Sequence, residues 1–348
     1  MLIETGSGAI DFVFGYAYSF LSNFFNGLLL YVLALIVSAI IFAVFLIILV
    51  IMFVYMFGWG ERKIIARIQS RHGPSYVGKF GILQNMADVI KLLSKQAPLP
   101  KKADKLIFLS MLPVVYALFV FMLFFIPITK FFVGISSSIS LIIVFALLSI
   151  SPTLIFLAGW SSGNKYSSIS AQRSSMVLVG YEMPMLIVVA SIAILSHSFS
   201  LANIVEMQQG LWYCLLLPIG FFVFFVTMLA ALERPPFDVR EADTELIAGW
   251  LTDVSAPYYA LALFLDYTRL FFGTLLISVL FLGGWLGPSF LPPFAWIIIK
   301  VVLLTIFIII VRATTVRMKI DRMIKIGWLY LLPLSVLNLA LALLFVFK

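Results

Sequence analysis

The stretch ERPPFDVREADTELIAGW, residues 233–250, places five carboxylates and two arginines in a chain that is mostly apolar. Asp238 and Glu241 have the D-x-x-E spacing of a helix capping box and follow two prolines, which stop a preceding helix. We expect a helix that begins at Val239 and presents Asp238, Glu241 and Glu245 on one face. Repulsion at about one turn's spacing raises the pKa of at least one of these acids, so that protons can exchange near neutral pH. The stretch is therefore predicted to act as a proton relay.

A simpler interpretation of this stretch is a helix cap followed by a solvated acidic loop. That interpretation accounts for Asp238 and Glu241, but the acids continue through Asp243, Glu245 and Asp253 among Leu, Ile, Ala and Trp residues. Counted to Asp253, the segment holds six acids against two bases. The relay interpretation is favoured, and the cap with a solvated loop stays open as the alternative.

Two further ionisable residues lie inside apolar runs. Glu182 follows Tyr181, which can donate a hydrogen bond, and a charged group at such a depth costs about 2.5–3.5 kcal/mol or more. We expect Glu182 to be neutral, paired or directed into a water-filled path, although a protonated acid that only holds helices together is the alternative. Lys300 is a base in the middle of an expected span. It is a candidate partner of Glu182 or a candidate member of the proton relay.

A basic segment covers residues 60–104. Lys63, Arg67 and Arg71 are spaced four residues apart, so a helix that continues past the first span would carry all three on one side. After a Gly-Pro break, apolar residues recur at helical spacing and predict an amphipathic helix at the membrane surface. These residues are Ile82, Leu83, Met86, Ile90 and Leu93.

Asp88 is an acid on that amphipathic helix. We expect it either to pair with a base or to face a polar cavity. The alternative for the whole segment is a solvated basic loop that binds lipid headgroups.

The elements that position these residues follow from composition. Apolar residues make up 63% of the chain and charged residues 11%, whereas about a quarter of the residues in a soluble domain are charged. Apolar runs of about twenty residues recur, and they are continuous rather than alternating, which excludes a β-barrel. We predict an all-α polytopic membrane protein. Its eight expected spans are residues 28–58, 106–128, 137–159, 173–196, 211–232, 262–284, 291–312 and 326–347.

The distribution of bases predicts the topology. Twenty of the 23 Lys and Arg residues lie in or beside the odd-numbered connections. The positive-inside rule makes those connections cytoplasmic and both termini external. We expect residues 1–27 to form an external, amphipathic segment and residues 28–348 a single membrane domain. The loops expected to carry the function are residues 59–105, 160–172, 233–261 and 313–325.

Composition also excludes other classes. The pI of about 9.5 does not indicate nucleic-acid binding, because the bases flank spans instead of forming one soluble face. Cys214 is the single cysteine, and His72 and His197 are far apart in sequence, so we expect no metal or iron–sulfur site in this chain.

Several segments resemble, in order and spacing, the complex I membrane subunit that is called H in bacteria and subunit 1 in mitochondria. The resemblance covers most of residues 50–335. The matching segments are ERKIIARIQSRHGPSYVGKFGILQNMADVIKLLSK, GWSSGNKYS, ERPPFDVREADTELIAGW, GGWLGPSFLPPFAW and RATTVR.

This resemblance implies an eight-span subunit of a proton-pumping oxidoreductase, at the junction between a hydrophilic redox arm and a membrane arm. Quinone is the expected substrate, and FMN and iron–sulfur clusters are expected in partner subunits, with none in this chain. The implied quinone passage comprises Glu61, Arg62, Lys63, Arg67, Arg71, Asp88 and Phe237. The implied acidic relay comprises Glu182, Asp238, Glu241, Asp243, Glu245, Asp253 and Asp266.

The chain departs from the family pattern at two places. Gln96 follows a lysine where the family commonly has an acid, and residues 253–256 replace an E-Y-S-G-like run. The resemblance implies an energy-conserving membrane of a cell or organelle, with the redox-arm loops on its cytoplasmic or matrix-like side. The soluble subunits choose the electron donor, whether NADH, a deazaflavin, ferredoxin or another.

Two alternatives stay open at this point. One is the membrane anchor subunit of a related membrane-bound hydrogenase. The other is an independent ion or solute transporter, in which Glu182 and Lys300 would form the transport site.

Overall fold

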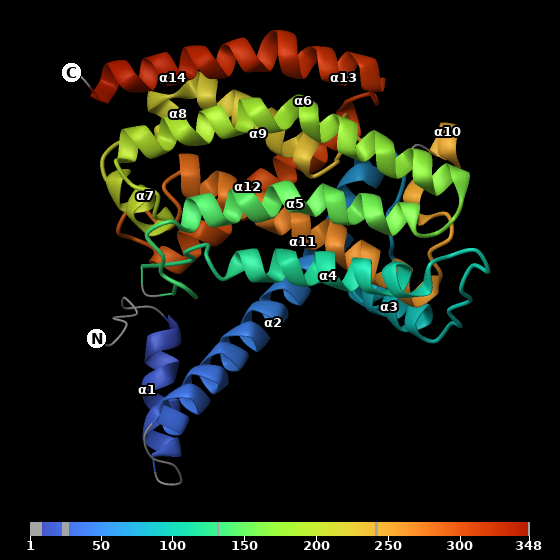
Figure 1. Cartoon of the computed structure of the whole chain (residues 1–348), viewed down its shortest axis with the longest axis horizontal. Helices are drawn as coiled ribbons and strands as arrows, with labels where there is room; N and C mark the ends of the chain where they lie inside the picture. The colour runs from blue at the N-terminus through green and yellow to red at the C-terminus, as the bar shows by residue number, and fades with distance from the viewer. Residues whose placement is uncertain (1–8, 23–27, 131, 241–242, 347–348) are drawn as a thin grey trace.

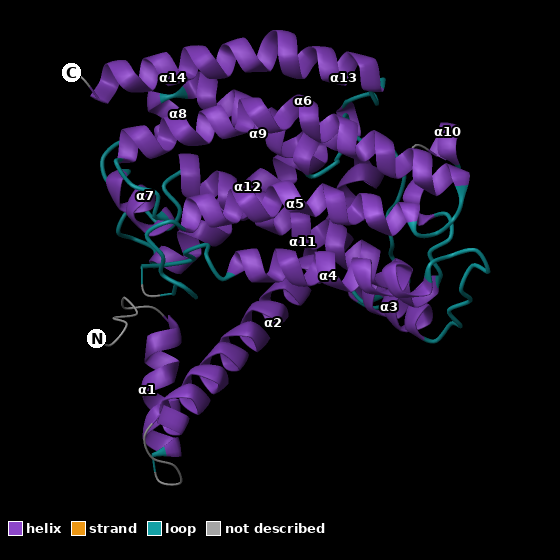
Figure 2. Cartoon of the chain, in the orientation of Figure 1, coloured by secondary structure: helices purple, strands orange, loops and turns teal. Residues whose placement is uncertain are grey.

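The structure is a computed structural model that describes residues 9–22, 28–130, 132–240 and 243–346. These residues form helices joined by turns and loops, and no strand occurs among them (Figure 2). The all-α prediction is therefore confirmed.

Seven helical segments of the described chain are long and apolar enough to cross a membrane. The last of them is continuous, although a π-helical turn, η3 (Gly327–Leu331), joins its two α-helical parts. The segments are α2 (Leu28–Ile68), α4 (Lys105–Leu123), α5 (Ser140–Trp160), α6 (Lys165–Ser196), α11 (Ala256–Phe281), α12 (Pro293–Thr314) and α13 (Ile320–Ile326) with α14 (Leu332–Val346).

The expected span at residues 211–232 is broken into two helices, α8 (Tyr213–Leu216) and α9 (Pro218–Ala231). Leu217 between them has non-helical backbone angles, and Pro218 lacks the amide hydrogen that would continue α8. With 14 residues, α9 is shorter than the roughly twenty needed for a full crossing. It contacts α6, α14 and α11, and seven of the eight expected crossings therefore occur as full-length helices in the described chain.

Two helices organise the bundle. In Figure 1, α4, α5, α6 and α14 lie side by side, with α9, α11 and α12 behind them. In α11 every residue from Thr268 to Phe281 is buried, as expected for a helix that is apolar on all sides. The helix α6 contacts α5, α9 and α14, and its Gly180 meets Gly327 so closely that a side chain on Gly327 would collide with the Gly180 carbonyl.

The helix α1 (Ala9–Leu21) packs against the first part of α2, and this pair projects from the bundle (Figure 1). Residues 1–8 and 23–27 of the predicted N-terminal segment lie outside the described residues. Apolar side chains such as Ile40 and Ile48 are exposed along the projecting part of α2, which is the surface that lipid solvates.

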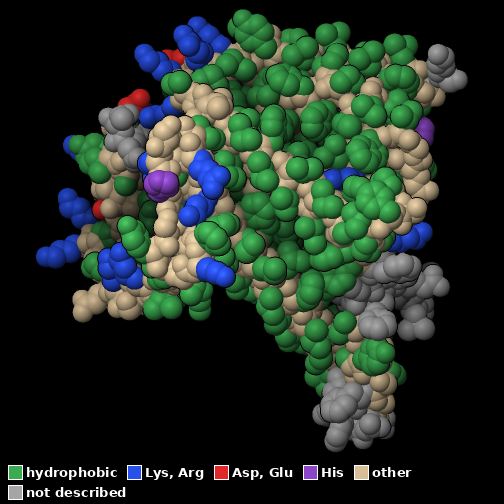
Figure 3. Space-filling view, turned by 180° about the vertical axis from the view of Figure 1, so that it is seen from behind, with side chains coloured by type: hydrophobic (Ala, Val, Ile, Leu, Met, Phe, Trp, Pro, Cys, Tyr) green, Lys and Arg blue, Asp and Glu red, His purple; other side chains and the backbone are tan. Residues whose placement is uncertain are grey.

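Polar segments gather at one end of the bundle, which we call the charged end. It comprises residues 59–105, 160–172, 233–240, 243–255 and 313–325, with the short elements η1 (Lys79–Gly81), α3 (Gln84–Leu93), α10 (Asp243–Leu246) and η2 (Gly249–Leu251). Most of the Lys and Arg side chains visible in Figure 3 lie at one end of the molecule. The opposite end comprises residues 124–130, 132–139, 197–217 and 282–292. Of these segments, residues 197–217 include α7 (Leu201–Met207).

Candidate functional site

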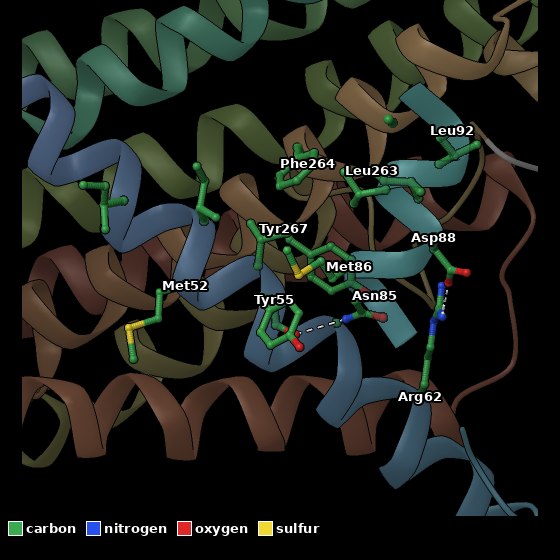
Figure 4. Close-up of a pocket in the computed structure, with 16 residues that line it drawn as sticks. Met52, Tyr55, Arg62, Asn85, Met86, Asp88, Leu92, Leu263, Phe264 and Tyr267 are labelled. Carbon is green, nitrogen blue, oxygen red and sulfur yellow. Dashed lines mark hydrogen bonds and ion pairs between the residues drawn. The ribbon is translucent and has the colours of Figure 1, made fainter. Parts of the chain in front are cut away.

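A largely apolar cavity of about 530 Å³ lies between α2, α3 and α11 at the charged end (Figure 4). Its apolar part is lined by residues such as Met52, Val89 and Phe264. Arg62 and Asp88 line its polar part. The cavity is within the range of about 300–1,000 Å³ that small-molecule sites occupy.

Hydrogen bonds to α2 fix α3 in place. The Tyr55 hydroxyl donates to the Ile82 carbonyl at 2.7 Å, and the Trp59 indole donates to the Phe80 carbonyl at 3.1 Å. From α3, the Asn85 amide donates back to the Tyr55 carbonyl at 3.0 Å. Gly58 permits this approach, since a Cβ there would lie 2.7 Å from the Asn85 amide nitrogen. The amphipathic helix expected after the Gly-Pro break is thus α3.

Arg62 and Asp88 close the polar part of the cavity with an ion pair of 2.6 Å. Gln84 donates a second hydrogen bond to Asp88 at 3.0 Å. Although partial burial opposes ionisation, these hydrogen bonds and the Arg62 charge hold the pKa of Asp88 below its usual value. Asp88 therefore both pairs with a base and faces the cavity.

The remaining residues of the implied quinone passage do not line this cavity. Lys63 is half-buried, while Arg67 and Arg71 are exposed. The expectation that one helix carries all three bases is wrong for Arg71, because α2 ends at Ile68 and Arg71 lies in the following loop. Phe237 is buried, with its ring 5.0 Å from that of Tyr181.

Glu61 lies behind the cavity at the centre of a buried cluster, with only 2% of its surface exposed. It pairs with Arg234 at 3.1 Å and with Arg312. The Tyr267 hydroxyl hydrogen-bonds the same carboxylate, and the Arg234 guanidinium lies 5.3 Å from the centre of the Tyr267 ring. Two bases and a phenol thus hold one acid.

A second cavity, of about 240 Å³, is polar. It lies between the segment after α9 and the helices α11 and α12, and charged residues of both signs line it. Its acids are Glu233, Asp238 and Asp266, and its bases are Arg234, Arg240 and Arg312. The structure therefore brings together two acids of the implied relay, Asp238 and Asp266.

Glu233 is the acid that the sequence did not single out. Its side chain is 8% exposed and pairs with Arg240 at 2.7 Å and Arg269 at 2.8 Å, and the Ser174 hydroxyl donates to it. Burial opposes its ionisation, but the two arginines outweigh burial and bring the pKa of Glu233 to about 2. Arg240 also pairs with Asp266 at 3.1 Å.

A sequence signal for Glu233 does exist. It directly follows an apolar run, and Arg269 lies inside the expected span 262–284. A base at that depth needs a partner, and a nearby acid is one group that can supply it.

Glu182 lies on α6, half-buried, beside a void of about 10 Å³. Glu233 and Ser174 line the same void, so Glu233 faces both this void and the polar cavity. The neighbouring Tyr181 donates its hydroxyl hydrogen to the Met323 carbonyl at 2.9 Å, which joins α6 to α13.

The helix expected to begin at Val239 is wrong, since Val239 and Arg240 are not helical and α10 begins at Asp243. Tertiary contacts replace the capping box: Val239 is buried, and the Arg240 carbonyl accepts a hydrogen bond from Ser170 at 2.5 Å. Glu241 lies outside the described residues, so the common face of three acids is not observed.

Glu245 and Asp253 of this stretch line neither of the two cavities. Glu245 is exposed and pairs with Arg173 at 2.5 Å and Arg317 at 3.6 Å. The hydrogen bond from Arg173 is the main reason that the pKa of Glu245 lies below its usual value. Asp243 begins α10, and Asp253 is half-buried, with one carboxylate oxygen that has no hydrogen-bond partner among the described residues.

Lys300 lies near the opposite end of the bundle. Its amine donates three hydrogen bonds, to the carbonyls of Leu282, Gly284 and Leu286, at 2.6, 2.8 and 2.6 Å. It also lies 4.6 Å from the centre of the Trp212 ring. Among the described residues Lys300 forms no ion pair, so it is not the partner of Glu182. No group of three or more potential metal-ligating side chains occurs in the same described ranges.

Comparisons with known proteins identify relatives of this chain. The chain is 39% identical over 302 residues to the H subunit of the F(420)H(2) dehydrogenase of Methanosarcina acetivorans, a match that covers 82% of this chain and 86% of the relative. It is 39% identical over 285 residues to the H subunit of the NADH-quinone oxidoreductase of Dehalococcoides mccartyi, covering 82% and 80%.

The corresponding protein of Carboxydothermus hydrogenoformans is 34% identical over 282 residues, covering 80% of this chain and 81% of the relative. The family model described as NADH dehydrogenase matches residues 29–343. The resemblance inferred from the motifs is thereby confirmed, and the chain belongs to the NADH dehydrogenase family.

Proposed function

We propose that this chain is the membrane subunit that forms the quinone site of a complex I-like oxidoreductase and couples quinone reduction to proton translocation. One observation carries the proposal: an apolar cavity of about 530 Å³ ends at the Arg62–Asp88 pair and adjoins a polar cavity lined by three acids. A quinone has the same two parts, an apolar tail and a polar headgroup.

The position of the apolar cavity supports access from the lipid. Ile48, Ile51 and Met52 line it from α2 and are also exposed on the surface of that helix. A tail that enters between these residues and α3 would stay in contact with apolar groups. Its headgroup would reach Arg62 and Asp88, where charge-assisted hydrogen bonds are available.

The buried acids support a proton path that leads away from the quinone. Asp238 and Asp266 face the polar cavity, Glu233 faces both that cavity and the void beside Glu182, and Glu182 lies inside α6. In this proposal protons pass from the polar cavity to Glu182. The relay roles of Glu241, Asp243, Glu245 and Asp253 remain predictions of the resemblance.

Electrons come from partner subunits in this proposal, because the chain transfers none itself. Two relatives bear the names of different dehydrogenases, one for F(420)H(2) and one for NADH. We therefore assign the donor, with the FMN and iron–sulfur clusters, to the soluble arm. The charged end would face that arm on the cytoplasmic or matrix-like side, and the long helices would contact other membrane subunits.

The first experiment isolates the native assembly in mild detergent. We expect co-purifying iron–sulfur subunits and quinone reduction that a quinone-site inhibitor blocks. A monodisperse single chain that transports ions or solutes alone would contradict the proposal. The transporter alternative has no support from the geometry, because Glu182 and Lys300 do not form a common site.

A matched pair of substitutions tests the cavity itself. Val89 lines the apolar cavity, whereas Ile90, the next residue of α3, is 59% exposed and does not line it. Val89→Trp should fill the cavity and raise the KM for quinone about tenfold or more, while Ile90→Trp adds the same bulk outside. Equal KM values in the two assembled variants would place the quinone elsewhere.

A further inference from the structure

The two cavities share a wall made by a single turn of α11. Of the residues that line the apolar cavity and those that line the polar cavity, Leu263 and Tyr267 belong to both sets. They lie four residues apart and therefore on one face of the helix. Each neighbouring residue lines one cavity: Phe264 lines only the apolar cavity, and Asp266 lines only the polar cavity.

We propose that Leu263 and Tyr267 form a barrier that prevents direct proton exchange between the quinone cavity and the acids of the polar cavity. This inference rests on the proposed function, because it assigns a role to the boundary between the two proposed sites. Both residues are positioning residues: they hold two compartments apart and take no part in the transfer itself.

Contacts on both sides hold the Tyr267 ring in the wall. Its hydroxyl hydrogen-bonds Glu61, and the Arg234 guanidinium lies 5.3 Å from the ring centre. On the cavity side the ring faces Gly58, where an added Cβ would be 3.5 Å from the ring carbon that bears the hydroxyl. Tyr267 is thus clamped between an ionic cluster and the backbone of α2.

The cluster behind the ring belongs to the polar side. Glu61 pairs with Arg234 and Arg312, and both arginines line the polar cavity. The Tyr267 hydroxyl is therefore hydrogen-bonded to an acid whose two arginine partners line the polar cavity. Its ring contributes an apolar surface to the quinone cavity.

A boundary of this kind is required by the chemistry of the two compartments. Carboxylates that face a hydrocarbon tail without water or a partner would lose solvation at a cost of several kcal/mol. Conversely, water that enters the quinone cavity from the polar side would carry protons directly to the substrate. Protons drawn to quinone by this shortcut leave the acids of the polar cavity and no longer pass on to Glu182, so reduction would continue while proton translocation falls.

The test measures protons pumped per quinone reduced, in the native assembly reconstituted into vesicles. Tyr267→Ala and Leu263→Ala each remove one side chain of the wall, and we expect either to lower that ratio roughly twofold or more while quinone reduction persists. Tyr267→Phe keeps the ring but removes the hydrogen bond to Glu61, so its ratio should lie between those of wild type and Tyr267→Ala.

Phe264→Ala is the matched control. It enlarges the apolar cavity by a similar volume, but it leaves the wall intact, so the KM for quinone changes and the pumping ratio does not. A wild-type ratio in both Tyr267→Ala and Leu263→Ala would overturn the barrier. An equal fall in Phe264→Ala would also overturn it, since cavity size alone would then set the ratio.

The barrier and the proposed function fail in distinguishable ways. If the proposed function is wrong, the wild-type assembly will not reduce quinone at all. If Tyr267→Ala does not assemble, Leu263→Ala and the smaller change Leu263→Val decide the question. A pumping ratio that falls from wild type to Leu263→Val and further to Leu263→Ala supports the barrier. A wild-type ratio in both variants contradicts it.

Discussion

Buried charge is neutralised differently at the two ends of the bundle. At the charged end, Glu61 and Glu233 are each held by the side chains of two arginines. Towards the opposite end, Lys300 is held by three backbone carbonyls. Side-chain partners can change their position and exchange one acid for another, whereas carbonyls of a packed backbone cannot. The first arrangement suits transfer of charge, and the second suits permanent anchoring.

The anchoring at Lys300 is complete in terms of hydrogen bonds. An ammonium group has three donors, and all three are used. The carbonyls belong to Leu282, which caps the C-terminus of α11, and to the loop that follows. The negative end of the helix dipole lies at this terminus. The same helix carries Asp266 and Tyr267 in its N-terminal half. One helix thus joins a fixed cation to the charged end.

Among the substitutions that test the contrast between the two ends, Glu233→Leu should cause the largest loss of stability. The substitution leaves Arg269, which is 1% exposed, and Arg240, which is 3% exposed, without their shared acid. Loss of one partner from a buried ionic group costs about 3–5 kcal/mol. We expect a lower midpoint of thermal unfolding, or failed assembly on native gels.

The double variant Glu233→Leu with Arg269→Met is the control. It removes both buried charges of one pair and leaves Arg240 bonded to Asp266. Apolar replacement of a buried pair is often nearly neutral, so much of the stability should return. A double variant as unstable as the single one would show that burial of charge is not the cause.

Acidification tests the same acid without mutation. Because the pKa of Glu233 is lowered to about 2, its ionisation stabilises the folded state above the ordinary glutamate value of 4.5. That stabilisation is lost progressively as the pH falls from about 4.5 toward 2. In wild type the thermal midpoint should fall across this window, and in Glu233→Gln this part of the fall should be absent. Parallel pH curves for the two proteins would contradict the assignment.

Lys300→Met should have a smaller effect, confined to stability. It leaves three carbonyls without their ammonium donor, but two of them belong to the loop after α11, and relaxation of this loop should keep the total cost below that of the unpaired arginines. The assembled variant should unfold at a lower temperature but pump the same number of protons per quinone. Lys300→Arg keeps the charge but not the compact ammonium. Its unfolding temperature should therefore lie between those of wild type and Lys300→Met. A loss of pumping at normal stability would instead give Lys300 a relay role.

The sequence predicted those features that depend on solvent and on local spacing. Long apolar runs predicted the helices because lipid leaves the backbone no other hydrogen-bond partners. The apolar repeat after the Gly-Pro break predicted α3, and Asp88 was expected to pair or to face a cavity. Each of these inferences uses residues close together in the chain.

Features that depend on distant residues were not predictable in the same way. The capping-box spacing at Asp238 predicted a helix, but Arg240 instead contacts Glu233 and Asp266. Such contacts outweigh a local preference worth about 1 kcal/mol. Lys300 likewise resembled an intramembrane relay, because the three carbonyls that surround it leave no mark in the sequence.

The smallest effect on stability is expected for Asp88→Asn, which tests the partly exposed pair at the polar part of the apolar cavity. The side chains of Arg62 and Asp88 are 44% and 32% exposed, and ion pairs of this kind contribute about 1 kcal/mol or less. Because the pKa of Asp88 is below its usual value, the acid stays ionised near neutral pH, and Asn imitates its protonated form.

The thermal midpoint of Asp88→Asn should therefore stay close to that of wild type, while the KM for quinone rises because Arg62 loses the partner that orients it in the cavity. Asp104→Asn is the control, since Asp104 is exposed just before α4 and lines neither cavity. A large fall in stability without a change in KM would make the pair structural. Charge held by side chains at this end would then resemble Lys300 in function, and the contrast between the two ends would no longer hold.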